Sequence, residues 1–266
     1  MKTQAVFSQQ FSIQYGDINR FGELTLPKIF DYFQDIAFIH ADHLAYAVEK
    51  KKQFDYAAVW TQMKGHMDVM PKWKDVITIS TWISPVEKGQ HLVYRNFAIE
   101  NSAGKEIGNG YGAFVFFDLK ARKAIPIPDE MVAYPTHDRY KDQHPFAVLP
   151  ALSDEASNPA EIACCPEISA VWSDIDLYQH VNNVRYISWA LDNLPHGFLK
   201  THQCQDVEIL FKKEMRLRDR AEIYTQNSED EFGHLRVQHE IKSLPHDNRP
   251  GHTLAKLQTT WQKRPQ

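Results

Sequence analysis

In the first half of the chain, hydrophobic residues first recur at helical spacing and then, further along, at every second position. An apolar stripe at helical spacing predicts a helix over residues 25–44, and Pro27 suits its first turn, where a missing N–H costs little. The stripe consists of Leu26, Ile29, Phe30, Phe33, Ile36 and Ala37. Alternating apolar residues then predict strands at 57–70, 76–83, 91–100 and 107–118.

The second half follows the same order. A helix is predicted to begin near Val181, with Asn182 or Asn183 as its cap, and to bury Val184, Ile187, Ala190 and Leu191. Strands are predicted at 207–215, 221–227, 234–242 and 253–262. One long helix against a run of antiparallel strands predicts an α+β architecture in which the helix covers one sheet face. A Pro-rich polar stretch between the halves indicates a linker, so we predict domains at 1–135 and 167–266 joined by 136–166.

An internal repeat supports this division. YGDINRFGELTLPKIFDYFQD, from residue 15, aligns without gaps with WSDIDLYQHVNNVRYISWALD, from residue 172. PKWKDVITISTW, from residue 71, is similar to MRLRDRAEIYTQ, from residue 215. A period of about 150 residues is too long for a solenoid unit and therefore indicates duplicated domains.

The candidate chemistry lies just before the second helix, where Asp174, Asp176, Tyr178 and His180 occur within seven residues. In an extended segment alternate side chains share one face, so we expect these four to point the same way. A carboxylate and an imidazole beside helix N-terminal amides can polarise a carbonyl and position a water. The alternative is structural, because Asp and Asn ahead of a helix are more often caps than catalysts.

Composition and charge narrow the class of protein. The chain has 266 residues, 43% of them hydrophobic, which is enough for one large core or two smaller ones. A net charge of −4 argues against general nucleic-acid binding, and no apolar run approaches the length of a membrane span. We expect a cytoplasmic protein, because the N-terminus lacks a secretory signal and three cysteines suggest no disulfide framework. His40 and His43 lack a clear third ligand, so we expect neither a metal ion nor a cofactor.

The segment DIDLYQHVNNVRYISWALDNLP, the tandem repeat and LFKKEMRLRD together resemble the acyl-acyl carrier protein (acyl-ACP) thioesterases of plants and bacteria. The resemblance covers nearly the whole chain. It implies a tandem hot-dog fold, in which each half wraps an antiparallel sheet around a long helix. It also implies hydrolysis of acyl-ACP to free fatty acid and carrier protein.

The same resemblance implies the site residues. The family's Asp and His fall on Asp176 and His180, and its acidic residue on a later strand falls on Glu214. Tyr178 occupies the position of the family's Asn, and a phenol has one rotatable O–H where an amide both donates and accepts in a fixed plane. Met215 stands where plant members often carry Cys, so water must be the nucleophile.

Each of these residues has an expected role. Glu214, acting with His180, is the candidate general base, and Asp176 would orient its neighbours or fix the His tautomer. The amides of the helix start would polarise the carbonyl, and they belong to Val181, Asn182 and Asn183. Asp174 is interpreted as structural, because its counterpart Asp17 lies in the half without the His. That first half is expected to lack the catalytic set and to shape the acyl tunnel.

The implied partner is the acidic acyl carrier protein, with no nucleic acid and no membrane insertion. A basic surface near Glu214 could receive it, with a second cluster at lysines 50–52, although ordinary solvated charge is the alternative for each residue. The basic residues near Glu214 are Lys212, Lys213, Arg216, Arg218 and Arg220. Two other functions stay open, a catalytically weak acyl-binding or carrier-binding module and an acyl-coenzyme A thioesterase. A monomer and a homodimer both stay open too.

Overall fold

A computed structural model of the chain divides it into two compact units, Met1–Phe146 and Ala147–Gln266. The structure describes residues 4–44, 55–139, 146, 148–149, 152, 162–164, 167–229, 234–245 and 251–264. Within this part of the chain, no helix combines the length and the apolar character needed to cross a membrane.

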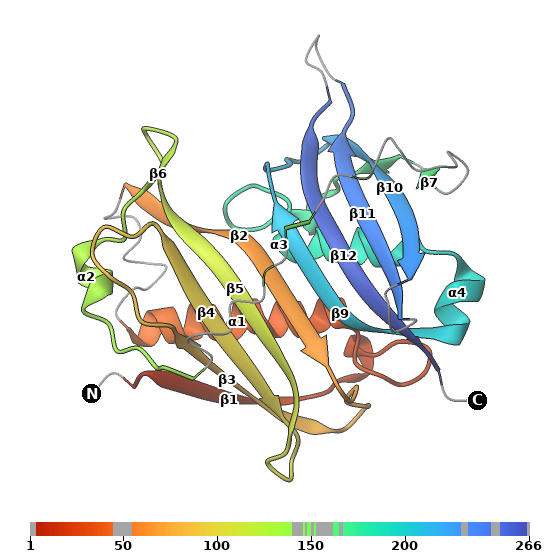
Figure 1. Cartoon of the computed structure of the whole chain (residues 1–266), viewed down its shortest axis with the longest axis horizontal. Coiled ribbons are helices and arrows are strands. Elements are labelled where there is room, and N and C mark those ends of the chain that lie inside the picture. The colour runs from red at the N-terminus through yellow and green to blue at the C-terminus, as the bar shows by residue number, and fades with distance from the viewer. Residues whose placement is uncertain are drawn as a thin grey trace. The chain divides into compact units, whose positions relative to one another are not determined.

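The first unit is an antiparallel sheet with one long helix on one face. Its strands are ordered β1-β3-β4-β5-β2, and β6 pairs with β5 at one end. The helix α1 contacts β1, β2 and β3, and it lies behind the sheet in Figure 1. The elements are β1 (Val6–Ser12), α1 (Leu26–His43), β2 (Tyr56–Met67), β3 (Val76–Ile83), β4 (Leu92–Glu100), β5 (Glu106–Asp118), β6 (Lys123–Ile125) and α2 (Asp129–Val132).

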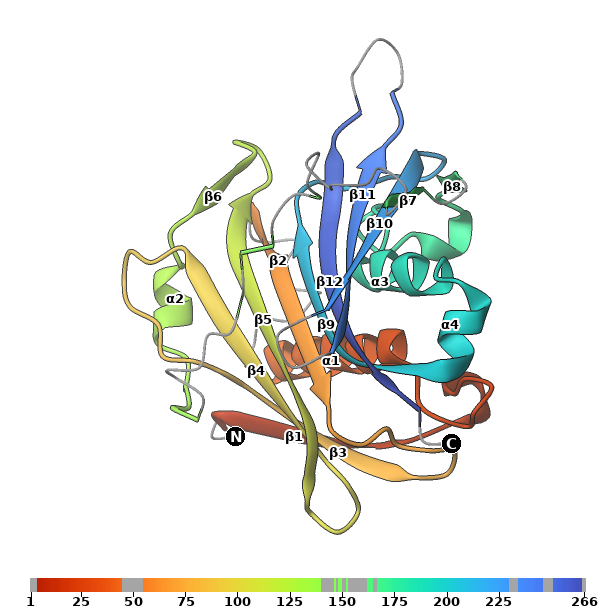
Figure 2. The same ribbon diagram turned by 45° about the vertical axis from the view of Figure 1, so that its right-hand side comes forward.

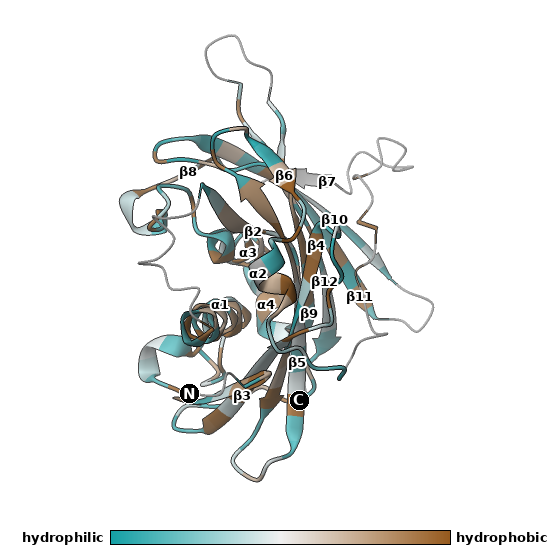
Figure 3. Cartoon of the chain, turned by 90° about the vertical axis from the view of Figure 1, so that its left-hand side faces the viewer, coloured by the Kyte–Doolittle hydropathy of each residue, from teal (hydrophilic) through white to brown (hydrophobic). Residues whose placement is uncertain are grey.

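The apolar stripe explains how α1 lies on this sheet. All six residues predicted to form the stripe are buried, and Pro27 lies in the first turn of the helix, as predicted. Phe33 is fully buried and stacks on Phe97 of β4 with ring centroids 4.3 Å apart. Hydrophobic stretches of α1 and of the strands appear brown in Figure 3. Burial of each large side chain stabilises the unit by about 1.5–3 kcal/mol relative to exposure.

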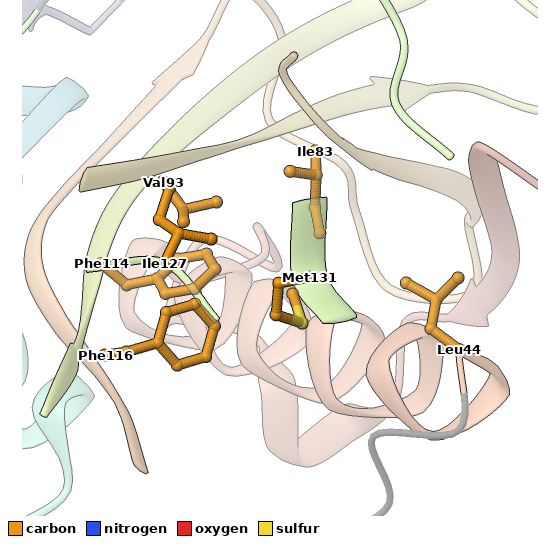
Figure 4. Packing of buried hydrophobic residues seen from close by; sticks show 7 residues of the cluster. All are labelled: Leu44, Ile83, Val93, Phe114, Phe116, Ile127 and Met131. Carbon is orange, nitrogen blue, oxygen red and sulfur yellow. The ribbon is translucent and has the colours of Figure 1, made fainter. Parts of the chain in front are cut away.

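A second group of apolar side chains closes the end of this unit beyond α1. Leu44, which caps the helix, is 3% exposed and belongs to a cluster with residues of β3, β4, β5 and the α2 region. Figure 4 shows these side chains converging around Met131. The cluster consists of Leu44, Ile83, Val93, Phe114, Phe116, Ile127 and Met131. The short helix α2, which the sequence analysis did not predict, therefore supplies part of the core.

The second unit has the same plan with a shorter helix. Its strands are ordered β9-β12-β11-β10-β7, with β8 also pairing with β10. The helix α3 contacts β11 and β12, and Figure 2 shows it beside these strands. The elements are β7 (Ile162–Cys164), β8 (Ile168–Ser169), a 3-10 turn (Trp172–Asp174), α3 (Asn183–Asp192), α4 (His196–Thr201), β9 (His202–Phe211), β10 (Arg220–Glu229), β11 (Leu235–Ser243) and β12 (Thr253–Lys263).

The predicted α+β architecture of antiparallel strands and few helices is confirmed, with one correction to the bounds of a strand. The strand predicted at 207–215 begins at His202 and ends at Phe211. It ends there because the amides of Lys212 and Lys213 both donate to the Leu254 carbonyl, which breaks the one-to-one ladder. The predicted linker also contains β7, which pairs with β10.

Candidate functional site

The candidate site is centred on an imidazole and a carboxylate from two loops of the second unit. His180 Nε2 lies 3.4 Å from Glu214 Oε2, and the two side chains are 29% and 37% exposed. An imidazole that contacts a carboxylate and still reaches solvent can take a proton from a water molecule. The structure thus brings together the two residues expected to form the general base.

Asp176 positions His180 through the backbone. Its Oδ1 accepts hydrogen bonds from the amides of Tyr178 and His180 at 2.8 and 3.3 Å. The Asp176 amide in turn donates to the His180 carbonyl at 2.8 Å, and Gln179 adopts a left-handed φ of 65°. An Asp side chain that bonds its own following amides is a common way to fix a tight turn. Asp176 thus fixes the turn that carries Tyr178 and His180, and its catalytic role stays a prediction.

The expected contact between Asp176 and the imidazole is not found. Within the described residues, Asp176 makes no hydrogen bond to the His180 ring, whose ion-pair partner is Glu214. The prediction of an extended segment with four side chains on one face is wrong as well. The segment forms a 3-10 turn and then the Asp176 turn, because carboxylates bonded to nearby amides compete with strand geometry.

Asp174 has the structural role expected of it. Its Oδ2 accepts from the Val171 amide at 2.9 Å, and its Oδ1 lies 3.3 Å from Arg185 Nε. In the first half Asp17 makes the matching contacts, with the Gln14 amide at 2.8 Å and with Lys28 at 3.7 Å. Because Asp17 makes these contacts in the half that lacks the His, the contacts of Asp174 stabilise the fold and need no catalytic explanation.

Asn182 is the cap of α3, as predicted. Its Oδ1 accepts a hydrogen bond from the Val184 amide at 2.9 Å, and Asn183 is the first helical residue. The four predicted core residues of the helix, Val184, Ile187, Ala190 and Leu191, are all buried.

The expected oxyanion donors need a correction. The Val181 amide donates to the Met215 carbonyl at 2.7 Å, and the Asn182 amide donates to the Asp174 carbonyl at 2.8 Å. These two N–H groups therefore stabilise the loops and do not point to a ligand. Among the predicted donors, the role stays a prediction for the Asn183 amide.

Glu214 lies in the loop between β9 and β10, not on a strand as predicted. The loop is anchored by Met215, which is 1% exposed and whose carbonyl accepts from the Val181 amide. Because Val181 follows His180 and Met215 follows Glu214, this one backbone bond places the imidazole beside the carboxylate.

Arg216 makes a contact that sequence reasoning missed. Its Nη2 lies 3.2 Å from Glu214 Oε1, so the two carboxylate oxygens have different partners. The sequence analysis assigned Arg216 to a carrier-binding surface. The spacing of Glu and Arg two residues apart is too common to have indicated this contact.

The segments that carry the pair also carry exposed apolar side chains, which we call the rim. Trp172 and Leu177 are 81% and 77% exposed, and Tyr178 and Leu217 are also exposed. The sequence did not predict exposure of Trp172, Leu177 and Leu217. Large side chains recur at two of these positions of the repeat, where Tyr15 matches Trp172 and Trp73 matches Leu217, and this recurrence was the available signal. Next to the rim, burial raises the pKa of the Tyr186 phenol above its ordinary value, so this hydroxyl stays protonated.

The first half builds the same turn without the same chemistry. Asn19 Oδ1 accepts from the amides of Phe21 and Glu23 at 2.8 and 3.2 Å, and Gly22 takes the left-handed position with φ 76°. Asn19 thus matches Asp176, and Glu23 matches His180. The Leu24 amide donates to the Pro71 carbonyl, as the Val181 amide donates to the Met215 carbonyl. Met70, which precedes Pro71, is therefore the equivalent of Glu214, which precedes Met215. In this half the three positions carry an amide, a carboxylate and a thioether.

Comparison with protein families gives two matches. Residues 4–134 match the model described as the acyl-ACP thioesterase N-terminal domain. Residues 159–263 match the acyl-ACP thioesterase C-terminal domain. Together these two models cover most of the chain.

Individual relatives agree with these matches. A chloroplastic palmitoyl-acyl carrier protein thioesterase of Gossypium hirsutum is 25% identical over 79% of this chain and 52% of its own length. The chain thus spans about half the length of the curated relatives it matches. A Lactobacillus plantarum structure provisionally described as an oleoyl thioesterase is 21% identical, with a TM-score of 0.83 over 100% of this chain and 99% of that one. An acyl-ACP thioesterase structure from Bacteroides thetaiotaomicron is also 21% identical, with a TM-score of 0.77 over 97% and 98% of the two chains. Both structures share the fold.

Proposed function

Because the chain belongs to the acyl-ACP thioesterase family, we propose that it hydrolyses the thioester of acyl-ACP to a free fatty acid and the carrier-protein thiol. The observation that carries this proposal is the contact between His180 and Glu214 at 3.4 Å. The repeat supports it, because the matching place in the first half keeps the turn but has Glu23 in place of His180 and Met70 in place of Glu214.

The proposed reaction uses water as the nucleophile. His180, paired with Glu214, accepts a proton from water while the oxygen bonds to the thioester carbon. The tetrahedral intermediate collapses with cleavage of the C–S bond, and the proton passes to the leaving thiolate. The intermediate's oxyanion needs a donor, for which the Asn183 amide at the start of α3 is proposed. No cofactor is required, because water supplies the only atoms that are added.

The carrier protein is proposed to bind at the rim of this site. Lys212, Lys213, Arg218 and Arg220 are exposed, and Arg220 already pairs with Glu167 at 3.0 Å. Exposed cations beside exposed Trp172 suit an acidic partner that carries an apolar chain. The lysines at 50–52, predicted as a second basic cluster, lie outside the described residues.

We further propose a tandem hot-dog fold, with a first domain at 1–135, a linker at 136–166 and a catalytic domain at 167–266. The support is that each unit has one helix on one face of an antiparallel sheet. The aromatic core of the first domain, with Phe30 and Phe33 fully buried, is proposed to shape the acyl tunnel. A cytoplasmic location is proposed as well, and the free buried thiol of Cys204 fits a reducing compartment.

A second function, an acyl-binding or carrier-binding module with weak catalysis, is favoured by one observation. Tyr178, at the position of the family's Asn, is 42% exposed on the turn beside His180. A phenol there takes up more space than an amide and cannot offer the same pair of hydrogen bonds. An acyl-coenzyme A thioesterase differs only in the leaving group, so the choice of substrates in the assay separates it.

The test is thiol release from acyl-ACP and matching acyl-coenzyme A esters of several chain lengths. We expect turnover of acyl-ACP by the wild type, with His180→Ala and Glu214→Ala reduced by at least about 100-fold because general base catalysis contributes that much. Glu23→Ala, at the position of the first half that matches His180, is the control and should keep wild-type activity.

Each other outcome selects another function. Higher turnover of the coenzyme A esters would identify an acyl-coenzyme A thioesterase. No turnover by the wild type, together with activity gained by Tyr178→Asn, would identify a binding module. If the wild type and all variants are inactive and bind no acyl ligand, both the hydrolase and the binding module are excluded.

A further inference from the structure

The guanidinium of Arg216 contacts the carboxylate that the mechanism needs. Arg216 Nη2 lies 3.2 Å from Glu214 Oε1, while His180 Nε2 lies 3.4 Å from Glu214 Oε2. The carboxylate is thereby held between a permanent cation and the imidazole, with one oxygen for each. We propose that Arg216 is a positioning residue that fixes the Glu214 carboxylate against His180, an inference that rests on the proposed thioesterase function.

The backbone around Arg216 is fixed by other groups. The Arg216 amide donates to Asp219 Oδ2 at 2.8 Å, and the Asp219 amide donates back to the Arg216 carbonyl at 3.0 Å. Arg218 adopts a left-handed φ of 70° within this turn. None of these contacts uses the Arg216 side chain, so the loop keeps its shape when that side chain is changed.

The first half shows the same turn without a carboxylate to hold. There the Lys72 amide donates to Asp75 Oδ2 at 2.8 Å, and Lys74 has a φ of 74°. Lys72 matches Arg216, and the position matching Glu214 is Met70. The turn is therefore independent of an ion pair at its start, and the Arg216–Glu214 contact belongs to the half with the imidazole.

Arginine suits this task because its planar guanidinium holds a carboxylate in a defined direction. The Glu214 carboxylate is 37% exposed, and the guanidinium contact fixes the direction of its Oε1. A positioned base acts at the chemical step, so loss of Arg216 should lower kcat and leave KM nearly unchanged.

The alternative role for Arg216 is a direct contact with the phosphate of the carrier's phosphopantetheine arm. The two roles differ in their response to a substrate without phosphate. Positioning of Glu214 affects every thioester equally, whereas a phosphate contact matters only for acyl-ACP and acyl-coenzyme A. An acyl-N-acetylcysteamine thioester, which carries no phosphate, therefore separates them.

The experiment compares Arg216→Gln, Arg216→Lys and Lys200→Gln with the wild type on acyl-ACP and on the acyl-N-acetylcysteamine thioester. Lys200→Gln is the control, because it removes one positive charge from an exposed position of α4, away from the proposed catalytic and carrier-binding residues. We expect kcat of Arg216→Gln to fall about 10-fold or more on both substrates, with KM within about 2-fold of wild type. Arg216→Lys should recover part of this loss, and the melting temperature should not change.

Three results would overturn the proposal. The first is an Arg216→Gln variant as active as Lys200→Gln in the presence of an active wild type. The second is a loss confined to acyl-ACP, which would assign the arginine to the phosphate. The third is a fall in activity that follows a fall in melting temperature. An inactive wild type would instead refute the thioesterase function itself, so the two failures are distinguishable.

Discussion

At the scale of single residues, Asp176 and Asn19 perform the same backbone task with different charge. Each side-chain oxygen accepts two amides of the following turn, at 2.8 and 3.3 Å for Asp176 and at 2.8 and 3.2 Å for Asn19. The turn therefore needs an acceptor and does not need a negative charge. Any requirement for the charge of Asp176 must come from the chemistry next to it.

This equivalence gives a prediction for Asp176→Asn. The variant should melt within about 1 °C of the wild type, because Asn19 holds the same turn in the first half. For a chain of this length a shift of that size corresponds to about 0.5 kcal/mol. A lower kcat at an unchanged melting temperature would show that the charge supports His180. Asp176→Ala provides the comparison, since it leaves two amides without their acceptor and should lose about 1 kcal/mol or more of stability.

Most of the candidate residues could be predicted from the sequence, but their contacts could not. The cap Asn182 and the buried face of α3 follow from local hydrogen bonding and helical spacing. The pairing of Glu214 with Arg216 depends on how the loop after β9 turns, and that turn is set by Asp219 and by the left-handed Arg218. The alternating polar residues along 174–180 wrongly predicted an extended segment. The segment turns instead, because the carboxylates of Asp174 and Asp176 accept hydrogen bonds from nearby amides.

At the scale of elements, the strand β5 accommodates α1 by omitting side chains. A Cβ at Gly110 would overlap the ring of Phe33, which is fully buried and stacks on Phe97. The aromatic ring of the helix thus packs directly on the strand backbone. The strand pattern alone predicted β5 but not this contact, which exists only between two packed elements.

Gly110→Ala should therefore destabilise the protein by about 1–3 kcal/mol, as expected for overpacking of a filled core. Denaturant unfolding measures this loss, with Gly197→Ala as the control because a Cβ there meets nothing within 4 Å. Adding Phe33→Leu should recover part of the loss caused by Gly110→Ala. Independent, additive losses in the double variant would contradict the proposed contact.

At the scale of the whole molecule, each unit buries one histidine in neutral form. Burial lowers the pKa of His40 to about 4, with a further contribution from the Arg95 guanidinium, whose Nη1 lies 3.1 Å from His40 Nδ1. Burial lowers the pKa of His239 to about 3, and its Nε2 has no hydrogen-bond partner among the residues that the structure describes. Both rings must lose contacts or accept a buried charge when they are protonated.

The protein should consequently lose stability in acid. Both folded pKa values lie below the unfolded value of about 6.5, so the unfolded chain binds more protons as pH falls below that value. Each histidine then contributes a slope of about 1.4 kcal/mol per pH unit, down to its own folded pKa. The stability from these groups is complete above about pH 6.5 and is lost as pH falls towards 4 and 3.

Unfolding free energies of the wild type and His239→Gln between pH 4 and 6.5 test this expectation. The variant should show a slope smaller by about 1.4 kcal/mol per pH unit. Exposed His91, changed to Gln, is the control and should leave the slope unchanged. Equal slopes in all three proteins would show that His239 does not titrate in the expected way.

The loops that precede α1 and α3 have a consequence for how such a chain acquires or loses chemistry. The hydrogen bonds to their backbone amides match, while Asn19, Glu23 and Met70 replace Asp176, His180 and Glu214. After duplication, each copy of the domain therefore keeps a loop whose backbone fold does not depend on which side chains occupy these three positions. Three side-chain differences distinguish the two loops. Under the proposed function, descendants of one ancestral fold can therefore gain or lose activity through these side chains without a change in topology.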